Sequence, residues 1–186
     1  RGTGYGLVLC VFGLEETGDY LRAEKVARRA VELQRRDPWA IHAVAHVMEM
    51  QGRTGDGIAW MRERTADWAT DNMFAYHNWW HLGLYHLDLG ETDRVLEIYD
   101  TAIRPQPSTV ALEMIDATAM LWRLHIRGAD VGGRWHELAD AWEPLAGDGS
   151  RALTVELPFG GTLVAIAPPG AFFFMALLLA LRNRVR

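Results

Sequence analysis

Apolar side chains recur at helical spacing along most of the chain, and the first 146 residues contain almost no pattern typical of strands. One example is the set Val95, Leu96, Ile98, Tyr99 and Ile103. The pattern predicts an all-α fold for this part of the protein. The expected helices span about residues 5–17, 20–35, 38–51, 55–69, 73–89, 92–103, 108–127 and 132–145.

The first clear turn signal lies at Gly18, where glycine allows the tight connection between two helices of a hairpin. Ala23, Ala27 and Ala30 follow on the next helix, and their small side chains permit close packing against neighbouring helices. Pro38 then starts another helix, at a position where its missing N–H group does no harm. This order of features is typical of the second half of a tetratricopeptide repeat.

The turn signals return at regular intervals. Gly52 lies 34 residues after Gly18, which is the period of tetratricopeptide repeats. Gly90 and Gly128 follow at intervals of 38 residues, which indicates longer first helices in the later hairpins. A single hairpin is too small to bury its own apolar face, so we expect the hairpins to stack. The sequence therefore predicts a tetratricopeptide-like α-solenoid of about four hairpins over residues 1–146.

The chain changes character after residue 147. Glycine and proline are frequent over residues 147–170, and residues 152–157 alternate as a short strand does. An apolar run of eleven residues follows at 171–181, whereas a helix needs about 20 residues to cross a bilayer. We expect residues 147–186 to form a divergent Gly/Pro-rich segment with an apolar terminal helix that is buried or covered by a partner.

Composition and charge narrow the classes of partner. Hydrophobic residues make up 49% of the 186 residues and charged residues 23%, a balance typical of globular domains. The net charge of -5 argues against nucleic acid and anionic membranes as partners. The single cysteine, Cys10, has no internal disulfide partner, so we expect a cytoplasmic protein in which Cys10 is buried as a small apolar residue.

Two histidine pairs are the unusual chemical feature of the sequence. His42 and His46 are four residues apart and therefore share one face of a helix, and the same holds for His77 and His81. Glu49 adds a carboxylate to the face of the first pair. Because the first helices of adjacent hairpins stand side by side, we expect the two pairs to face each other.

Two interpretations of these residues remain open. Imidazoles four apart can reach one ion from a single rigid helix, so two such pairs with Glu49 would suit a divalent metal such as zinc, or an iron or manganese centre. No glutamate follows His42 directly, which excludes the His-Glu-x-x-His protease motif. Alternatively, the histidines pack among aromatic residues and bond to carbonyl groups or carboxylates. His86, His125 and His136 stand alone and are expected to be structural.

Eight tryptophans form a second signal, and most of them occur at helical spacing, as expected for a core between repeats. Trp79 and Trp80 are adjacent, so their side chains point about 100° apart on a helix. One of them can pack inward while the other lines a groove, where an indole ring is a good anchor for a ligand. Packing of both in the core is the alternative.

The sequence of residues 37–53, together with Gly57-Ile58 and residues 77–82, resembles the tetratricopeptide repeat protein 38 family. The resemblance covers about residues 5–145, and its specific parts are the two histidine blocks with Asn78-Trp79-Trp80. It implies a right-handed helical repeat fold in a bacterial member of the family. Since family members are longer, we expect this chain to be part of a longer protein. The family has no established activity, so the resemblance implies fold more than function.

These observations favour a binding scaffold over an enzyme. We expect its concave groove to bind a protein, a peptide or a small molecule. The alternative is a metal-dependent enzyme in which His42, His46, His77 and His81 hold a divalent metal; no other cofactor is predicted. The residues expected to line the groove are His42, His46, Glu49, His77, Asn78, Trp80 and His81.

Overall fold

The computed structural model describes the backbone of residues 4–146 and the side chains of residues 6–142. The described residues form helices and connecting turns, with no strand among them, as the apolar pattern predicted. The expected segment at 147–186 lies outside the described residues. The chain divides into two compact units, Arg1–Pro105 and Gln106–Arg186.

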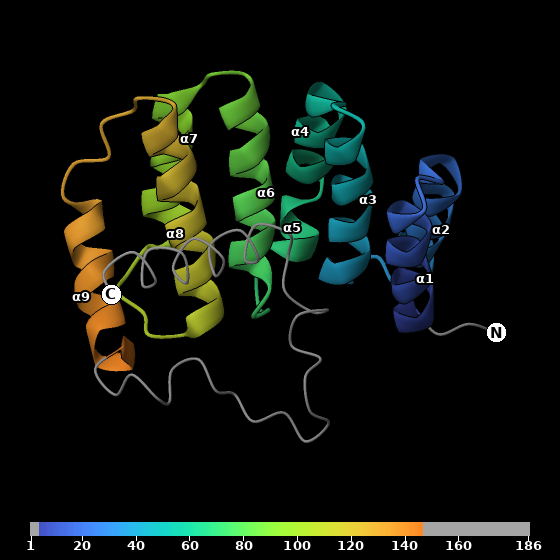
Figure 1. Ribbon diagram of the computed structural model, residues 1–186. Coiled ribbons are helices and arrows are strands. Elements are labelled where there is room, and N and C mark those ends of the chain that lie inside the picture. Colours follow the sequence, from blue (N-terminus) through green and yellow to red (C-terminus); the bar gives the residue numbers. More distant parts are fainter. Residues whose placement is uncertain (1–3, 147–186) are drawn as a thin grey trace, which may run out of the picture. The chain divides into compact units, whose positions relative to one another are not determined.

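The first unit contains seven α-helices and a short π-helical turn within the described residues. They are α1 (Gly4–Glu16), α2 (Tyr20–Leu33), α3 (Pro38–Met50), α4 (Thr54–Glu63), α5 (Thr65–Trp68), α6 (Ala75–Asp88), α7 (Thr92–Ile98) and η1 (Tyr99–Ile103) (Figure 1). The described part of the second unit contains α8 (Ala111–Ile126) and α9 (Arg134–Ala146), and Trp142 Nε1 of α9 donates to Thr118 Oγ1 of α8 at 3.1 Å.

Left-handed glycines make the turns that the sequence predicted. Gly18, Gly52 and Gly90 have φ angles of 76°, 66° and 75°, and they connect α1 to α2, α3 to α4 and α6 to α7. The N–H group of Gly18 donates to the carbonyl oxygen of Glu15 at 2.8 Å, which closes the end of α1. Because residues with a Cβ rarely adopt this conformation, glycine at these positions determines where each hairpin turns.

The helix expected at 55–69 is divided in two. Arg64 leaves helical geometry between α4 and α5, with φ -112° and ψ 11°. Thr65 Oγ1 donates to the carbonyl oxygen of Arg62 at 2.9 Å, and Trp68 Nε1 donates to that of Met61 at 2.9 Å. These side chains satisfy the last carbonyl groups of α4, so the helix can end there without leaving them unpaired.

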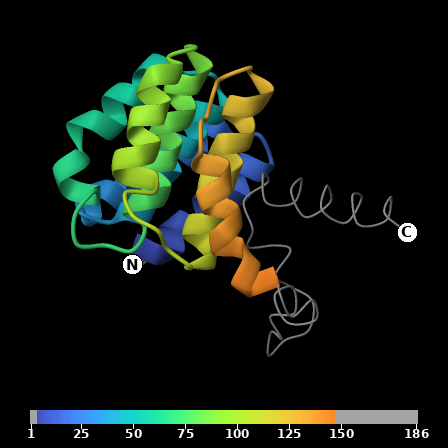
Figure 2. The ribbon, with the colours of Figure 1, turned by 90° about the vertical axis from the view of Figure 1, so that its left-hand side faces the viewer.

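Helix α3 lies at the centre of the first unit. It packs against α2 and α4, and also against α1 and α6, while α6 in turn packs against α4 and α7 (Figure 1). Figure 2 shows α6 and α7, the two green helices, running side by side. Eight residues of α3 and ten of α6 are buried, so most of both helices belongs to the core. The two histidine pairs lie on these two helices.

One close approach fixes the spacing of α3, α4 and α6. A Cβ atom at Gly57 of α4 would lie 2.1 Å from Cζ of Tyr85 on α6, so the tyrosine ring packs directly on the α4 backbone. The Tyr85 hydroxyl group donates to the carbonyl oxygen of Ala45 on α3 at 2.5 Å. Burial raises the pKa of Tyr85, so this hydroxyl keeps its proton and remains a donor.

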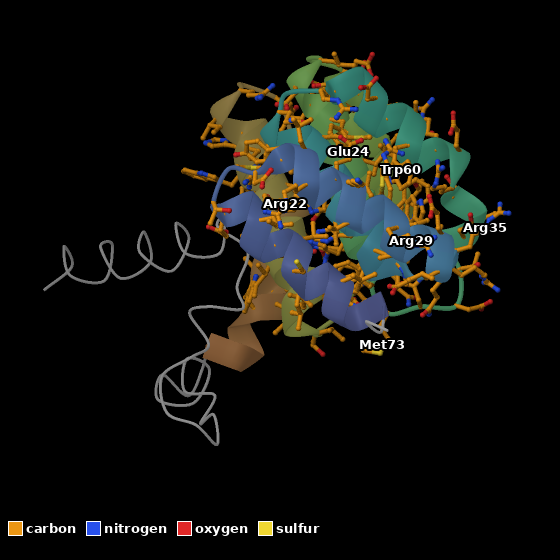
Figure 3. The ribbon with its side chains drawn as sticks, turned by 90° about the vertical axis from the view of Figure 1, so that its right-hand side faces the viewer. Arg22, Glu24, Arg29, Arg35, Trp60 and Met73 are labelled. Carbon is orange, nitrogen blue, oxygen red and sulfur yellow. The ribbon has the colours of Figure 1, made fainter. Side chains whose placement is uncertain are left out.

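Polar and aromatic contacts join α2 to α4 on the face that carries Glu24 and Trp60 (Figure 3). Glu24 accepts hydrogen bonds from Arg28, at 2.9 Å, and from Arg53, at 2.6 Å. The Trp60 indole lies against the guanidinium groups of Arg28 and Arg64, whose carbons are 4.7 and 3.6 Å from the ring centroid. These contacts tie the first hairpin to the second.

Cys10 is exposed on α1, so the prediction of a buried thiol is wrong; its position falls on the outer face of that helix, which the apolar run alone did not reveal. None of the helices formed by residues 4–146 is both long enough and apolar enough to cross a membrane.

Candidate functional site

The start of α3 positions the first histidine pair. Asp37 caps this helix, since its carboxylate accepts hydrogen bonds from the backbone N–H groups of Trp39 and Ala40 at 3.0 and 3.3 Å. Pro38 occupies the first turn, where its fixed φ angle suits a helix. His42 and His46 follow on one face of α3, and the matching face of α6 carries His77 and His81.

Ring nitrogens of the two pairs meet between α3 and α6. Nε2 of His42 lies 2.9 Å from Nε2 of His81, and the latter lies 3.2 Å from Nε2 of His77. The imidazole centroid of His46 lies 5.3 Å from those of both His42 and His81. The expectation that the two pairs face each other is therefore met. We call His42, His46, His77 and His81 the imidazole cluster.

Two carboxylates hold the outer nitrogens of the cluster. Nδ1 of His81 lies 2.6 Å from Oε2 of Glu49, and Nδ1 of His46 lies 2.5 Å from Oε1 of Glu15. A carboxylate accepts, so each contact favours a proton on Nδ1 and leaves the lone pair on Nε2. Metal-binding histidines in proteins have this same arrangement, in which a carboxylate fixes the tautomer of the ligand.

The environment shifts the pKa values of the first pair in opposite directions. Burial, together with the neighbouring imidazoles of His81, His77 and His46, lowers the pKa of His42 well below its ordinary value. For His46, burial lowers the pKa, but the hydrogen bond and the charge of Glu15 outweigh it and leave the pKa raised. His42 is therefore a neutral imidazole near pH 7, the form that can bind a metal ion.

Aromatic rings surround the imidazole cluster. Phe12 of α1 lies 5.9 Å from both His42 and His46, measured between ring centroids. Phe74 lies 5.1 Å from His42 and stacks on Trp39 at 3.8 Å. The cluster is almost fully enclosed, because the exposed fractions of His42, His77 and His81 are 4%, 5% and 2%. The side chain of His46 is the most accessible of the four, at 21%.

Of the other residues expected to line a groove, Asn78 and Trp80 lie in the core, whereas Glu49 is partly exposed. Asn78 is buried, and its amide group donates to the carbonyl oxygen of Pro38 at 3.3 Å. Trp80 is 6% exposed and stacks on His77, with 5.5 Å between centroids. Trp79 packs edge-on against Trp68 at 4.8 Å. Glu49 crosses to the other helix and bonds His81 rather than a histidine of its own helix.

Two contacts of histidine side chains could not be predicted from the sequence. Glu15 lies at the end of α1, 31 residues before the histidine that it bonds, and nothing in its local sequence marks it as part of the cluster. His86 does not stand alone: its Nδ1 lies 2.5 Å from Oε2 of Glu91, and Nη2 of Arg62 donates to its Nε2 at 3.2 Å. It joins α4, α6 and the start of α7, as expected for a structural residue.

The geometry of the cluster fits a metal ion. His42, His46 and His81 each offer a ligand atom, and these atoms all lie within 4.8 Å of one another. Zinc–nitrogen bonds are 2.0–2.1 Å long, so ligands of a tetrahedral site lie about 3.3 Å apart. Nε2 of His77 lies 3.2 Å from that of His81, but His77 is not part of this group of three.

A comparison of the chain with models of known protein families finds no match.

Proposed function

We propose that this protein binds a divalent transition-metal ion through the imidazole cluster. His42, His46 and His81 are the ligands, and His77, whose Nε2 lies 3.2 Å from that of His81, is the candidate for a fourth. Glu15 and Glu49 hold the tautomers of His46 and His81. Imidazole suits zinc, copper, nickel and divalent iron better than the hard ions magnesium and calcium, which prefer oxygen ligands.

The observation that carries the proposal is the position of His81 Nε2, which lies 2.9 Å from one imidazole Nε2 and 3.2 Å from another. Because Nδ1 of His81 faces Glu49, neutral His81 has one lone pair on Nε2 and accepts one good hydrogen bond there. The Nε2 atom of the other neighbouring histidine then has no good hydrogen bond to His81: it either competes for the same lone pair or points its own lone pair at it. A cation between the rings removes this conflict, since every Nε2 lone pair can point at it.

A proton is the competing occupant of the same position. A protonated His81 would donate from Nε2 to one neighbour and form an ion pair with Glu49. Burial disfavours a charged imidazolium at His81. Protonation of a second histidine of the cluster would be disfavoured further, because the two positive charges would repel each other. A metal ion with several nitrogen ligands gains enough binding free energy to overcome the same desolvation, whereas a single proton forms one bond.

The experiment is elemental analysis of the untagged protein after equilibration with Zn²⁺ and removal of unbound metal. We expect about one ion per chain, lost in His81→Ala and in the milder variant His46→Gln. His125→Ala is the matched control, because His125 is an exposed histidine on α8, and this variant should retain the ion. Circular dichroism checks that each variant is folded, and Co²⁺ absorption reports nitrogen coordination directly. A folded wild-type protein that takes up no Zn²⁺ or Co²⁺ would overturn the proposal.

We propose in addition that the hairpins follow the tetratricopeptide pattern and that the family resemblance is genuine. The 34-residue interval between Gly18 and Gly52 supports this, as do their left-handed turns. The proposal predicts that full-length relatives carry further hairpins with the same interval.

Ligand binding by the helical scaffold is a second candidate function, supported by one observation. Trp39 is 45% exposed, although it stacks on Phe74 beside His42, so an indole face is available next to the cluster. A peptide or small ligand selected from a library should lose its affinity in Trp39→Ala and keep it in Trp122→Ala, a tryptophan of similar exposure (38%) on α8. Equal effects of the two substitutions would count against this site.

A further inference from the structure

Glu15 is a buried carboxylate whose charge is only partly compensated. Its exposed fraction is 7%, and Oε1 bonds His46 while Oε2 has no hydrogen-bond partner among the described residues. Its one ionic partner in the part of the chain that the structure describes is the imidazole of His46. Among the described residues it forms no ion pair with an arginine or a lysine, so a cation nearby would stabilise its negative charge in the core.

Glu49 places a second negative charge at the cluster. Its side chain is 27% exposed and bonds His81, whose Nε2 lies within 3.2 Å of the Nε2 atoms of both His42 and His77. The two carboxylates come from different helices, α1 and α3, and bond different histidines, so both charges act on the centre. The imidazole ligands themselves are neutral and contribute no charge.

We propose that Glu15 and Glu49 are the charge-selecting residues of the metal centre, and that they make it electrically neutral for a divalent cation. Two negative charges balance one M²⁺ ion. A monovalent ion leaves one buried negative charge, and a trivalent ion leaves one buried positive charge. This inference rests on the proposed metal-binding function and adds the charge class of the ion together with the residues that determine it.

Electrostatics gives the inference a quantitative signature. The energy between a carboxylate and an ion is proportional to the product of their charges, so removing one carboxylate weakens M²⁺ binding by twice the free energy that it costs M⁺. A tenfold loss for Zn²⁺ therefore corresponds to about a threefold loss for Ag⁺, a monovalent ion that also binds imidazole. General damage to the site would reduce both affinities by similar factors.

The variants are Glu15→Gln and Glu49→Gln, which remove the charge but keep a carbonyl oxygen that accepts from Nδ1. Glu32→Gln is the control, because Glu32 of α2 is 63% exposed and pairs with Arg29. All variants are made in a Cys10→Ser background, since the exposed thiol would bind Ag⁺. Affinities for Zn²⁺ and Ag⁺ are measured by calorimetry at one pH.

We expect each charge-removing variant to lose about 10- to 100-fold in Zn²⁺ affinity. The Ag⁺ loss should be about the square root of that factor, and Glu32→Gln should change neither affinity by more than about twofold. Equal losses for the two ions, or no Zn²⁺ loss in Glu15→Gln, would overturn the inference while leaving the metal centre in place. If the wild-type protein binds neither ion, the proposed function itself fails.

Discussion

The Nδ1 atom of His46 on α3 lies 2.5 Å from Oε1 of Glu15 on α1, and this contact joins the first helical hairpin to the imidazole cluster. A cation bound at Nε2 of the same ring would polarise the Nδ1–H group, which donates to Glu15. The packing of α1 and the occupancy of the centre are therefore expected to depend on each other.

The first prediction follows from that dependence. Zn²⁺ binding should slow hydrogen exchange of the backbone amides in α1, because the strengthened His46–Glu15 bond opposes local opening of this helix. The effect should be largest in the turn that contains Glu15 and should be weaker in Glu15→Gln. Helix α7, which carries none of the cluster histidines, provides the internal reference. Equal slowing in α1 and α7 would indicate global stabilisation without a specific link.

The second prediction concerns the whole first unit. A ligand that binds the folded state alone raises the unfolding free energy, by about 2.7 kcal/mol at a free concentration of 100 times Kd. We expect urea titrations to show this gain with Zn²⁺ and its loss on addition of a chelator. Mg²⁺ should give no gain, because it prefers oxygen ligands in octahedral geometry. A gain from Mg²⁺ equal to that from Zn²⁺ would show that the effect does not come from imidazole ligation.

The third prediction tests the packing between α4 and α6. Gly57→Ala places a methyl group inside the contact with the buried ring of Tyr85, and overpacking of this kind costs about 1–3 kcal/mol or more. Gly55→Ala is the matched control in the same helix, since its Cβ would meet nothing within 4 Å. It should stabilise the protein by about 0.5–1 kcal/mol through helix propensity. Chemical denaturation should therefore give changes in unfolding free energy of opposite sign for the two variants. Similar changes would contradict the close approach of Tyr85 to Gly57.

The fourth prediction concerns pH. Burial by itself would raise the pKa of Glu24, but the hydrogen bonds from Arg53 and Arg28 outweigh it and hold the pKa below the ordinary value of 4.5. A carboxyl group with a lowered pKa in the folded state adds stability above its unfolded pKa, and that stability disappears as the pH falls through the folded pKa. The stability difference between wild type and Glu24→Gln should therefore be present at neutral pH and should shrink below pH 4.5.

Glu32→Gln supplies the control for the pH experiment. Glu32 pairs with Arg29, but their side chains are 63% and 61% exposed, so solvent screens the interaction. Its stability difference from wild type should be small and should change little with pH. A pH dependence as strong as that of Glu24→Gln would mean that general surface charge, rather than the Glu24 contacts, determines the acid response.

The sequence by itself determined the helices, the turns and the spacing of the histidines. A helical period decides which residues share a face, and Gly18, Gly52 and Gly90 mark the turns because their left-handed backbone conformation is a local property. For the same reason, the sequence was sufficient to place His42 with His46, and His77 with His81. It was not sufficient for α4, which ends at Glu63, where side chains of the following turn satisfy its last carbonyl groups.

Tertiary structure decided which faces meet. The contact between His42 and His81 spans 39 residues of sequence, and the contact between Glu15 and His46 spans 31. Such contacts depend on the distance between the helices and on their rotation about their axes. Close packing of buried side chains determines both, whereas the local helical period determines neither. Tyr85 against Gly57 is one such determinant. The sequence therefore gave candidate ligands on two helices, whereas helix packing brought their ring nitrogens together and added Glu15 from a third helix.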